Sequence, residues 1–139
     1  MSGKKWGAYS SFEKALIVGL PIGILILAAI LAVSLFAIFS DVKSICTEAQ
    51  TEFEGDCVDA LMALVESDKF GYREKNKAIW ALGQLGDERA LPLLEKLYTG
   101  EVQEKPFDPS RRIVQYTVKK ALKQCRGEFS LTRWMYRWL

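Results

Sequence analysis

The sequence lacks histidine altogether, and this absence narrows the chemistry that the protein can perform. Histidine is the commonest general base and metal ligand, and it activates the nucleophile in Ser-His and Cys-His sites. No Cys-x-x-Cys pair is present to hold zinc instead. The acidic side chains form no recognisable catalytic group either. We therefore expect a protein that is not an enzyme and that binds no metal or other cofactor.

Charge is absent from one long stretch near the amino terminus. The 25 residues at positions 15–39 include no charged side chain. As a helix they would be about 37 Å long, which exceeds the ~30 Å hydrocarbon core of a bilayer. A buried core helix keeps a polar stripe, and a signal peptide has a shorter apolar region that ends in small residues. We therefore expect residues 15–39 to form a single transmembrane helix.

Two glycines and a proline lie in the first half of this expected span. Gly19 and Gly23 form a Gly-x-x-x-Gly, a spacing that lets two helix backbones approach closely. Pro21 lies between them and removes one backbone hydrogen bond, which favours a bend against a neighbouring helix. Gly19, Pro21 and Gly23 are thus expected to pack against another helix in the membrane.

Lysines on either side of the span predict its orientation. Lys4, Lys5 and Lys14 precede it, whereas only Lys43 follows it closely. Basic residues are retained on the cytoplasmic side, so residues 1–14 should be cytoplasmic and the C-terminal domain periplasmic or otherwise extracytoplasmic. The opposite topology would make the protein a cytoplasm-facing adaptor.

Cysteine is scarce, with three residues in the chain. In an extracytoplasmic domain, a disulfide between Cys46 and Cys57 would tie the end of the span to the first domain helix. Three unpaired thiols are the alternative, and the spacing does not decide between them. Cys125 occupies an apolar helical position and is expected to be buried.

The rest of the chain contains no run that alternates as a β-strand does. Residues 40–56 are expected to form an acidic juxtamembrane linker. Beyond it, apolar side chains recur at helical spacing and predict an all-α domain with helices at 57–67, 72–85, 88–98 and 109–125. Gly86 should end the second helix, Asp87 should cap the third, and Asp108 with Pro109 should begin the fourth. The expected apolar side of the fourth helix consists of Ile113, Val114, Tyr116, Val118, Ala121 and Leu122.

Two parts of this domain resemble each other. Residues 60–64 (ALMAL) align with 90–94 (ALPLL) at an offset of 30, and 81–85 (ALGQL) align with 121–125 (ALKQC) at an offset of 40. Repeated helix pairs that stack side by side make an α-solenoid. We expect residues 57–126 to form about two such pairs, with Gly83 allowing close contact between helices.

The stretch KAIWALGQLGDERALPLLEKL resembles a HEAT repeat of the short kind that also occurs in phycobilisome-lyase-like proteins. In that family one helix typically ends in A-L-G-x-L-G-D and the next begins with R-A-L-P-x-L, which match residues 81–87 and 89–94. Lys123 and Cys125 depart from the pattern, as in a terminal capping repeat. The resemblance implies protein binding and brings no catalytic residues. Because some relatives attach or remove bilins, a lyase-like factor that handles a chromophore or cofactor is the alternative.

The last segment, residues 127–139, is rich in tryptophan and arginine. As a helix it would be amphipathic. Its apolar face would consist of Leu131, Trp134, Met135, Trp138 and Leu139, and its other side of Arg133, Tyr136 and Arg137. This tail is expected to contact the membrane interface or a partner, or to cap its own solenoid.

Basic residues are concentrated between position 110 and the end of the chain, where Glu128 is the lone acid. Nucleic-acid binding is nevertheless not expected, because the net charge is only +2 and the chain has an apparent anchor. The sequence as a whole predicts a membrane-anchored, non-catalytic accessory or scaffold subunit. Its expected partners are the lipid bilayer and the membrane protein subunits of a hetero-oligomeric complex.

Overall fold

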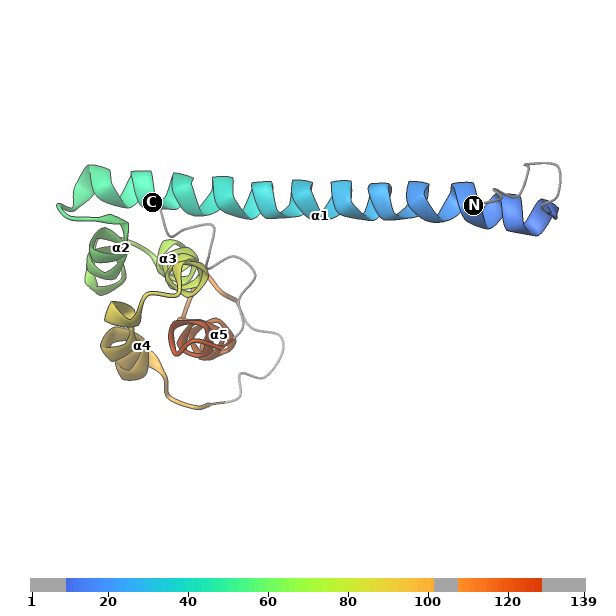
Figure 1. Cartoon of the computed structure of the whole chain (residues 1–139). Helices are drawn as coiled ribbons and strands as arrows, with labels where there is room; N and C mark the ends of the chain where they lie inside the picture. Colours follow the sequence, from blue (N-terminus) through green and yellow to red (C-terminus); the bar gives the residue numbers. More distant parts are fainter. Residues whose placement is uncertain (1–9, 102–107, 129–139) are drawn as a thin grey trace. The chain divides into compact units, whose positions relative to one another are not determined.

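The computed structural model describes residues 10–101 and 108–128 (Figure 1). The helices are α1 (Ser11–Glu52), α2 (Cys57–Glu66), α3 (Tyr72–Leu85), the short 3-10 helix η2 (Glu88–Ala90), α4 (Leu91–Leu97) and α5 (Gln115–Cys125). No strand occurs in these two ranges, which confirms the all-α prediction. The tail residues Arg133, Trp134, Met135, Arg137, Trp138 and Leu139 lie outside the described residues, so their expected contacts remain predictions.

The chain divides into two compact units, Met1–Ala37 and Ile38–Leu139. In the first unit, α1 begins with a capping box. The hydroxyl of Ser10 accepts a hydrogen bond from the amide of Glu13, whose carboxylate accepts one from the amide of Ser10. No residue in an 18-residue apolar window of α1 is buried, and by length and composition this helix could cross a membrane.

The glycines and the proline expected to pack in the membrane lie inside α1. The helix continues through Pro21. A Cβ atom added at Gly19 or Gly23 would meet nothing within 4 Å. Packing of Gly19, Pro21 and Gly23 against a second helix therefore remains a prediction.

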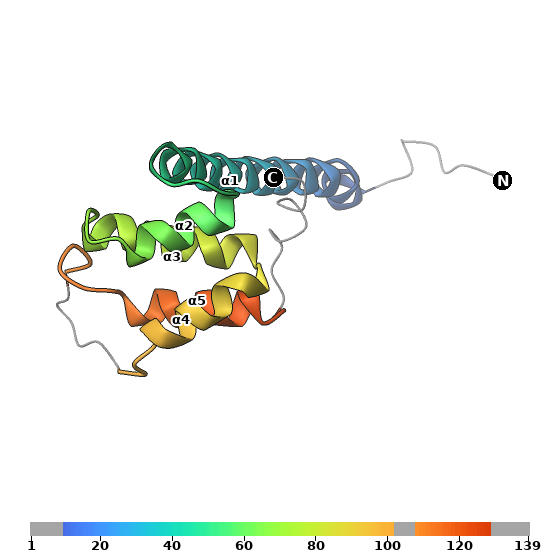
Figure 2. The ribbon, with the colours of Figure 1, turned by 90° about the vertical axis from the view of Figure 1, so that its left-hand side faces the viewer.

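The second unit consists of three successive layers of helices (Figures 1 and 2). Residues 38–52 of α1 form the first layer, α2 with α3 the second, and α4 with α5 the third. Within this stack α3 contacts both α2 and α5, and α4 contacts α5. The two helix pairs expected from the repeats are therefore present.

The first layer comes from residues that sequence reasoning assigned to an acidic linker. This segment is helical as far as Glu52. Val42, Cys46 and Ala49 are buried at helical spacing, and Ile38, Phe39 and Ile45 pack against the same core. Two helix pairs leave an apolar face uncovered at each end of a solenoid. The end of α1 covers one of these faces.

The junction between the two helix pairs has the predicted caps. Gly86 ends α3 in the left-handed conformation, with φ 64°, and its amide donates to the carbonyl of Leu82. The Asp87 side chain then caps η2 by accepting a hydrogen bond from the amide of Arg89. Both predictions are confirmed, and η2 precedes α4 as an additional short turn.

The expected start of the fourth helix is wrong. α5 begins at Gln115 rather than at Pro109. The Asp108 side chain instead accepts hydrogen bonds from the amide and hydroxyl of Ser110 in a local turn. The expected apolar side was also wrong in one residue: Val118, Leu122 and Cys125 are buried, whereas Tyr116, two positions before Val118 and therefore on the opposite side of the helix, is 74% exposed.

Asn76 of α3 explains why residues 109–114 are not helical. Its amide nitrogen donates to the carbonyls of Pro109 and Arg112, at 2.8 and 2.9 Å. Its carbonyl oxygen accepts from the amide of Val114 at 2.8 Å. One side chain thus satisfies three backbone groups that a helix would otherwise have paired, and it fixes the approach to α5.

We expect Asn76→Asp to destabilise the fold by about 2 kcal/mol. The carboxylate would still accept from Val114, but both donors would be lost and a negative charge would face the carbonyls of Pro109 and Arg112. Urea unfolding of the full chain in detergent, followed by circular dichroism, measures this change. Lys77→Asp, at an exposed position one residue later, is the control. Equal midpoints for the two variants would contradict the assigned role of Asn76.

Candidate interaction surfaces

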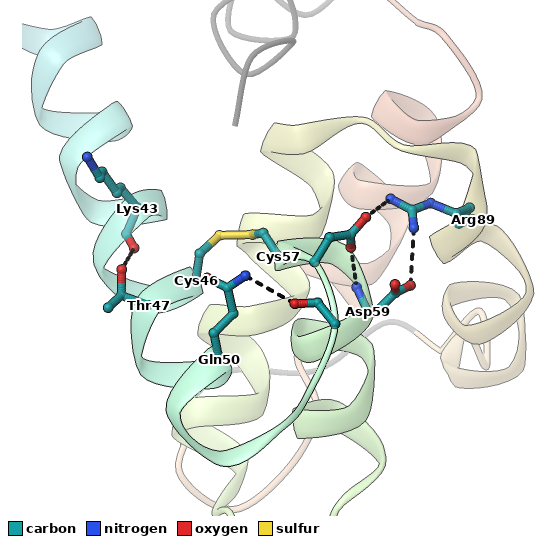
Figure 3. Close-up of a disulfide and its surroundings, with 9 residues drawn as sticks. Lys43, Cys46, Thr47, Gln50, Cys57, Asp59 and Arg89 are labelled. Carbon is teal, nitrogen blue, oxygen red and sulfur yellow. Dashed lines mark hydrogen bonds and ion pairs between the residues drawn. A yellow bond between two sulfur atoms is a disulfide. The ribbon is translucent and has the colours of Figure 1, made fainter.

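A covalent joint connects the first layer to the second (Figure 3). Cys46 of α1 and Cys57, the first residue of α2, form a disulfide whose Cα atoms are 5.1 Å apart. Next to it, the side chain of Gln50 donates to the carbonyl of Gly55 at 3.3 Å. The disulfide therefore holds the end of α1 against α2 across the short connection at residues 53–56.

An exposed ion-pair cluster centred on Arg89 links the start of α2 to the junction between α3 and α4 (Figure 3). The guanidinium nitrogens of Arg89 lie 2.7 Å from Asp56, 3.2 Å from Asp59 and 3.0 Å from Asp87. Asp56 also caps α2 by accepting from the amide of Asp59. These ion pairs therefore connect the start of α2, in one helix pair, to η2, the short turn that leads into the other pair.

The cluster keeps its carboxylates ionised. The side-chain hydrogen bond from Arg89 lowers the pKa of Asp87 below its ordinary value. Partial desolvation acts to raise the pKa of Asp56, but the amide of Asp59 and the Arg89 guanidinium outweigh it and lower that pKa too. The two aspartates in turn raise the pKa of Arg89. All of these side chains are partly exposed, so solvent screening keeps the contribution to stability modest.

The lowered pKa values predict a loss of stability in acid. A carboxylate whose pKa is lower in the folded state stabilises the fold above its unfolded-state pKa, and this contribution is lost as pH falls through the folded-state pKa. Below about pH 4 the wild-type urea midpoint should therefore decrease. Arg89→Met should lower the free energy of unfolding by about 1 kcal/mol at neutral pH and flatten this acid dependence. Equal acid slopes in the two proteins would contradict the role given to the cluster.

A groove on the third layer, here named the α4–α5 groove, hollows the surface of the domain among the described residues. Its volume is about 280 Å³, and it is lined by Glu95, Tyr98, Lys119, Leu122, Lys123, Arg126 and Glu128. Lys119, Lys123 and Arg126 occupy positions i, i+4 and i+7 of α5 and its C-cap, so they share one side. Two ion pairs lie on the rim, Arg126 with Glu95 at 2.7 Å and Lys123 with Glu128 at 3.3 Å.

Sequence reasoning missed Asn76, Arg89 and the α4–α5 groove as organising features. Asn76 and Arg89 act on residues more than 30 positions away, which a local pattern does not reveal. The sequence signals were that Arg89 falls inside the repeat motif and that basic residues are concentrated near the end of the chain. Cys125 is buried, as expected, and takes no part in the disulfide; its thiol donates to the carbonyl of Leu82. Within the described residues, no group of three or more histidine, cysteine or acidic side chains is arranged to hold a metal ion.

The junction between α3 and α4 lies in the segment that matches a known protein family. The family model of the PBS lyase HEAT-like repeat matches residues 75–99. Residues 75–99 are thus similar to a HEAT-like repeat. The match includes Gly83, Gly86, Asp87 and Arg89, so it covers α3's side of the close helix contact, both caps and two of the four residues of the ion-pair cluster. Comparisons with curated proteins and with solved structures found no match. A HEAT-like repeat indicates a protein-interaction or scaffold role.

Proposed function

We propose that this chain is a single-pass membrane protein whose HEAT-like domain acts as a non-catalytic accessory or scaffold subunit of a larger membrane complex. Residues 1–14 lie in the cytoplasm, and the domain lies on the other side of the membrane. Its partners are membrane protein subunits and the bilayer, and it acts through protein contacts rather than through a cofactor.

The exposed apolar part of α1 is the observation that carries the proposal. Residues 15–37 place large apolar side chains such as Leu25, Leu27 and Phe36 in the open, each more than two-thirds exposed. A soluble protein rarely exposes so large a continuous apolar surface. The hydrocarbon core of a bilayer would cover these apolar side chains, and a helix can cross it because its backbone groups hydrogen-bond to one another.

The disulfide supports an extracytoplasmic domain. Disulfides persist in the periplasm, the secretory pathway and outside the cell, whereas cytosolic thiols are kept reduced. The joint between Cys46 and Cys57 lies a few residues after the apolar stretch. Its location agrees with the orientation inferred from Lys4, Lys5 and Lys14.

The surface of the domain supports a role in protein contacts. Cys125, which takes no part in the disulfide, is buried and so offers no accessible thiol. The exposed features are instead a charged groove and a HEAT-like helical surface. Both are suited to binding another polypeptide.

Extraction from native membranes tests this function. The protein should be recovered in mild detergent as part of an assembly larger than its own micelle, together with other membrane proteins in fixed ratio. Arg89→Met and Asn76→Asp, which weaken the domain, should reduce that ratio, whereas the Lys77→Asp control should not. Recovery as a monomer without fixed partners would contradict the subunit role.

A further inference from the structure

One side of α5 carries an exposed group of one aromatic and three basic side chains. They recur at helical spacing on the side opposite the buried Val118 and Cys125. Because α3 and α4 pack against α5, which lies in the third layer (Figure 2), this is the outer side of the helix. The group is here named the basic face of α5 and consists of Tyr116, Lys119, Lys120 and Lys123.

Two of the three lysines on this face have no ionic partner. Lys123 and the nearby Arg126 each have a carboxylate partner, at 3.3 and 2.7 Å. Among the residues that the structure describes, Lys119 and Lys120 form no ion pair, and both are exposed. The positive charge of these two side chains is therefore not matched within the domain.

Tyr116 adds an exposed aromatic ring to the same face. Its side chain is not part of the core. At a membrane surface, tyrosine rings lie at the level of the lipid headgroups. Lysine side chains beside them can extend along apolar surface and keep their ammonium groups among the headgroups. Tyr116 and the two unpaired lysines thus form a surface of the kind that meets a bilayer.

We propose that the basic face of α5 binds the headgroups of anionic phospholipids in the leaflet next to the domain. This inference rests on the proposed function, because it requires the membrane anchor. The second unit begins at Ile38, which directly follows the apolar part of α1. An anchored domain is therefore held at the bilayer surface, and its basic face needs no separate encounter with a soluble partner.

The strength of the attraction favours a bilayer over a soluble acidic protein. Each basic side chain near an anionic membrane surface strengthens binding about fivefold, so two unpaired lysines supply a factor of roughly 25. This factor is small for a partner that must be bound from solution. It is sufficient for headgroups that the anchor keeps at high effective concentration. The lipids also diffuse in the leaflet, so they need no shaped pocket.

The test uses the purified full chain in nanodiscs, which are small bilayer discs held by a scaffold protein. The bilayer is phosphatidylcholine alone or an equal mixture of phosphatidylcholine and phosphatidylglycerol. Lysines are acetylated with an amine-reactive reagent, and the rate at each position is measured by mass spectrometry. Both leaflets have the same composition, so the direction of insertion does not matter. Lys77, exposed on α3, is the internal control.

A pair of charge-reversal variants separates the basic face from charge in general. The face variant is Lys119→Glu with Lys120→Glu, in which Lys123 remains as the lysine that reports on the face. The matched control is Arg73→Glu with Lys77→Glu, at exposed positions of α3, which changes the net charge by the same amount. All of these positions are exposed, and circular dichroism in the nanodiscs checks that both variants are folded.

Wild-type Lys119 and Lys120 should react about tenfold more slowly in the anionic bilayer than in the neutral one. Lys77 should react equally in both. High salt should remove the protection, because it shortens the range of the attraction. In the face variant Lys123 should react equally in the two bilayers. The α3 control should retain the wild-type protection of Lys119 and Lys120.

The outcomes distinguish this inference from the function on which it rests. A chain that does not enter nanodiscs of either composition would contradict the anchor and the proposed function. A chain that enters them, but whose Lys119 and Lys120 react equally in the two bilayers, would overturn this inference alone. Protection that persists at high salt would overturn it as well. Protection found only in native membranes would do the same and would assign the basic face to an acidic partner subunit.

Discussion

Replacing Gly83 with valine is expected to lower the free energy of unfolding by about 3 kcal/mol. Gly83 lies where α3 crosses α5, and a Cβ atom there would be 2.8 Å from the Cα and 2.9 Å from the Cβ of Ala121. A backbone atom cannot move aside as the end of a flexible side chain does. The two helix pairs would therefore have to separate at their main contact. The short distances to Ala121 confirm the close helix contact that the sequence predicted at Gly83.

The measurement is urea or thermal unfolding of the full chain in detergent, with Gly83→Ala as an intermediate case. Gly71→Ala is the control, because a Cβ there would meet only the carboxylate end of Glu74. We expect the control to change the free energy of unfolding by less than about 1 kcal/mol. Similar stability for Gly83→Val and the control would show that α3 and α5 do not pack as described.

Removing the disulfide is expected to have an effect of similar size. Cys46 and Cys57 are 11 residues apart, and closing a loop of this length in the unfolded chain stabilises a fold by about 3 kcal/mol. In addition, the first layer would lose its covalent joint to α2. Cys46→Ala with Cys57→Ala should therefore unfold at lower urea concentration than the wild type.

A reductant breaks the disulfide without changing the side chains, so it distinguishes the loss of the disulfide from the loss of packing that the two alanine substitutions cause. Dithiothreitol should lower the urea midpoint of the wild type and leave that of the double variant unchanged. Cys125→Ala is the matched control, since it removes a buried thiol that is not part of the joint. It should retain the wild-type response to reductant. If the wild type does not respond to dithiothreitol, the disulfide does not stabilise the domain.

The helices and their caps were predictable because their signals are local. Gly86 and Asp87 specify the end of one helix and the start of the next within two positions, and the apolar spacing identifies the buried faces of α2 and α3. The HEAT-like motif then related the helix pairs to each other. Together these signals predicted the all-α class and the two helix pairs that follow α1.

The errors share one physical cause, which is that tertiary contacts override local preference. Asp108 with Pro109 is a good helix start by composition, yet Asn76 binds the following backbone in a non-helical form. The acidic residues within positions 40–56 predicted a juxtamembrane linker. In the structure Val42, Cys46 and Ala49 on the other side of the same helix complete the core.

The charged surfaces were recognisable only in part. A concentration of basic residues near the end of the chain was visible in the sequence. Their arrangement into a groove was not, because the groove requires Glu95 and Tyr98 from α4 beside α5. The Arg89 cluster likewise joins carboxylates from two helix pairs. Both features depend on the stack and could be identified only after it was known.

The proposed function depends on a domain that is anchored to a membrane and faces an oxidising compartment. The state of the cysteines in living cells tests this claim most directly. Cells are quenched with acid, the protein is denatured, and free thiols are labelled with a maleimide that adds mass. With three cysteines and one disulfide, we predict one label per chain before reduction and three after it. For Cys125→Ala we predict none and then two. Three labels on the wild type before reduction would place the domain in a reducing compartment and contradict the account.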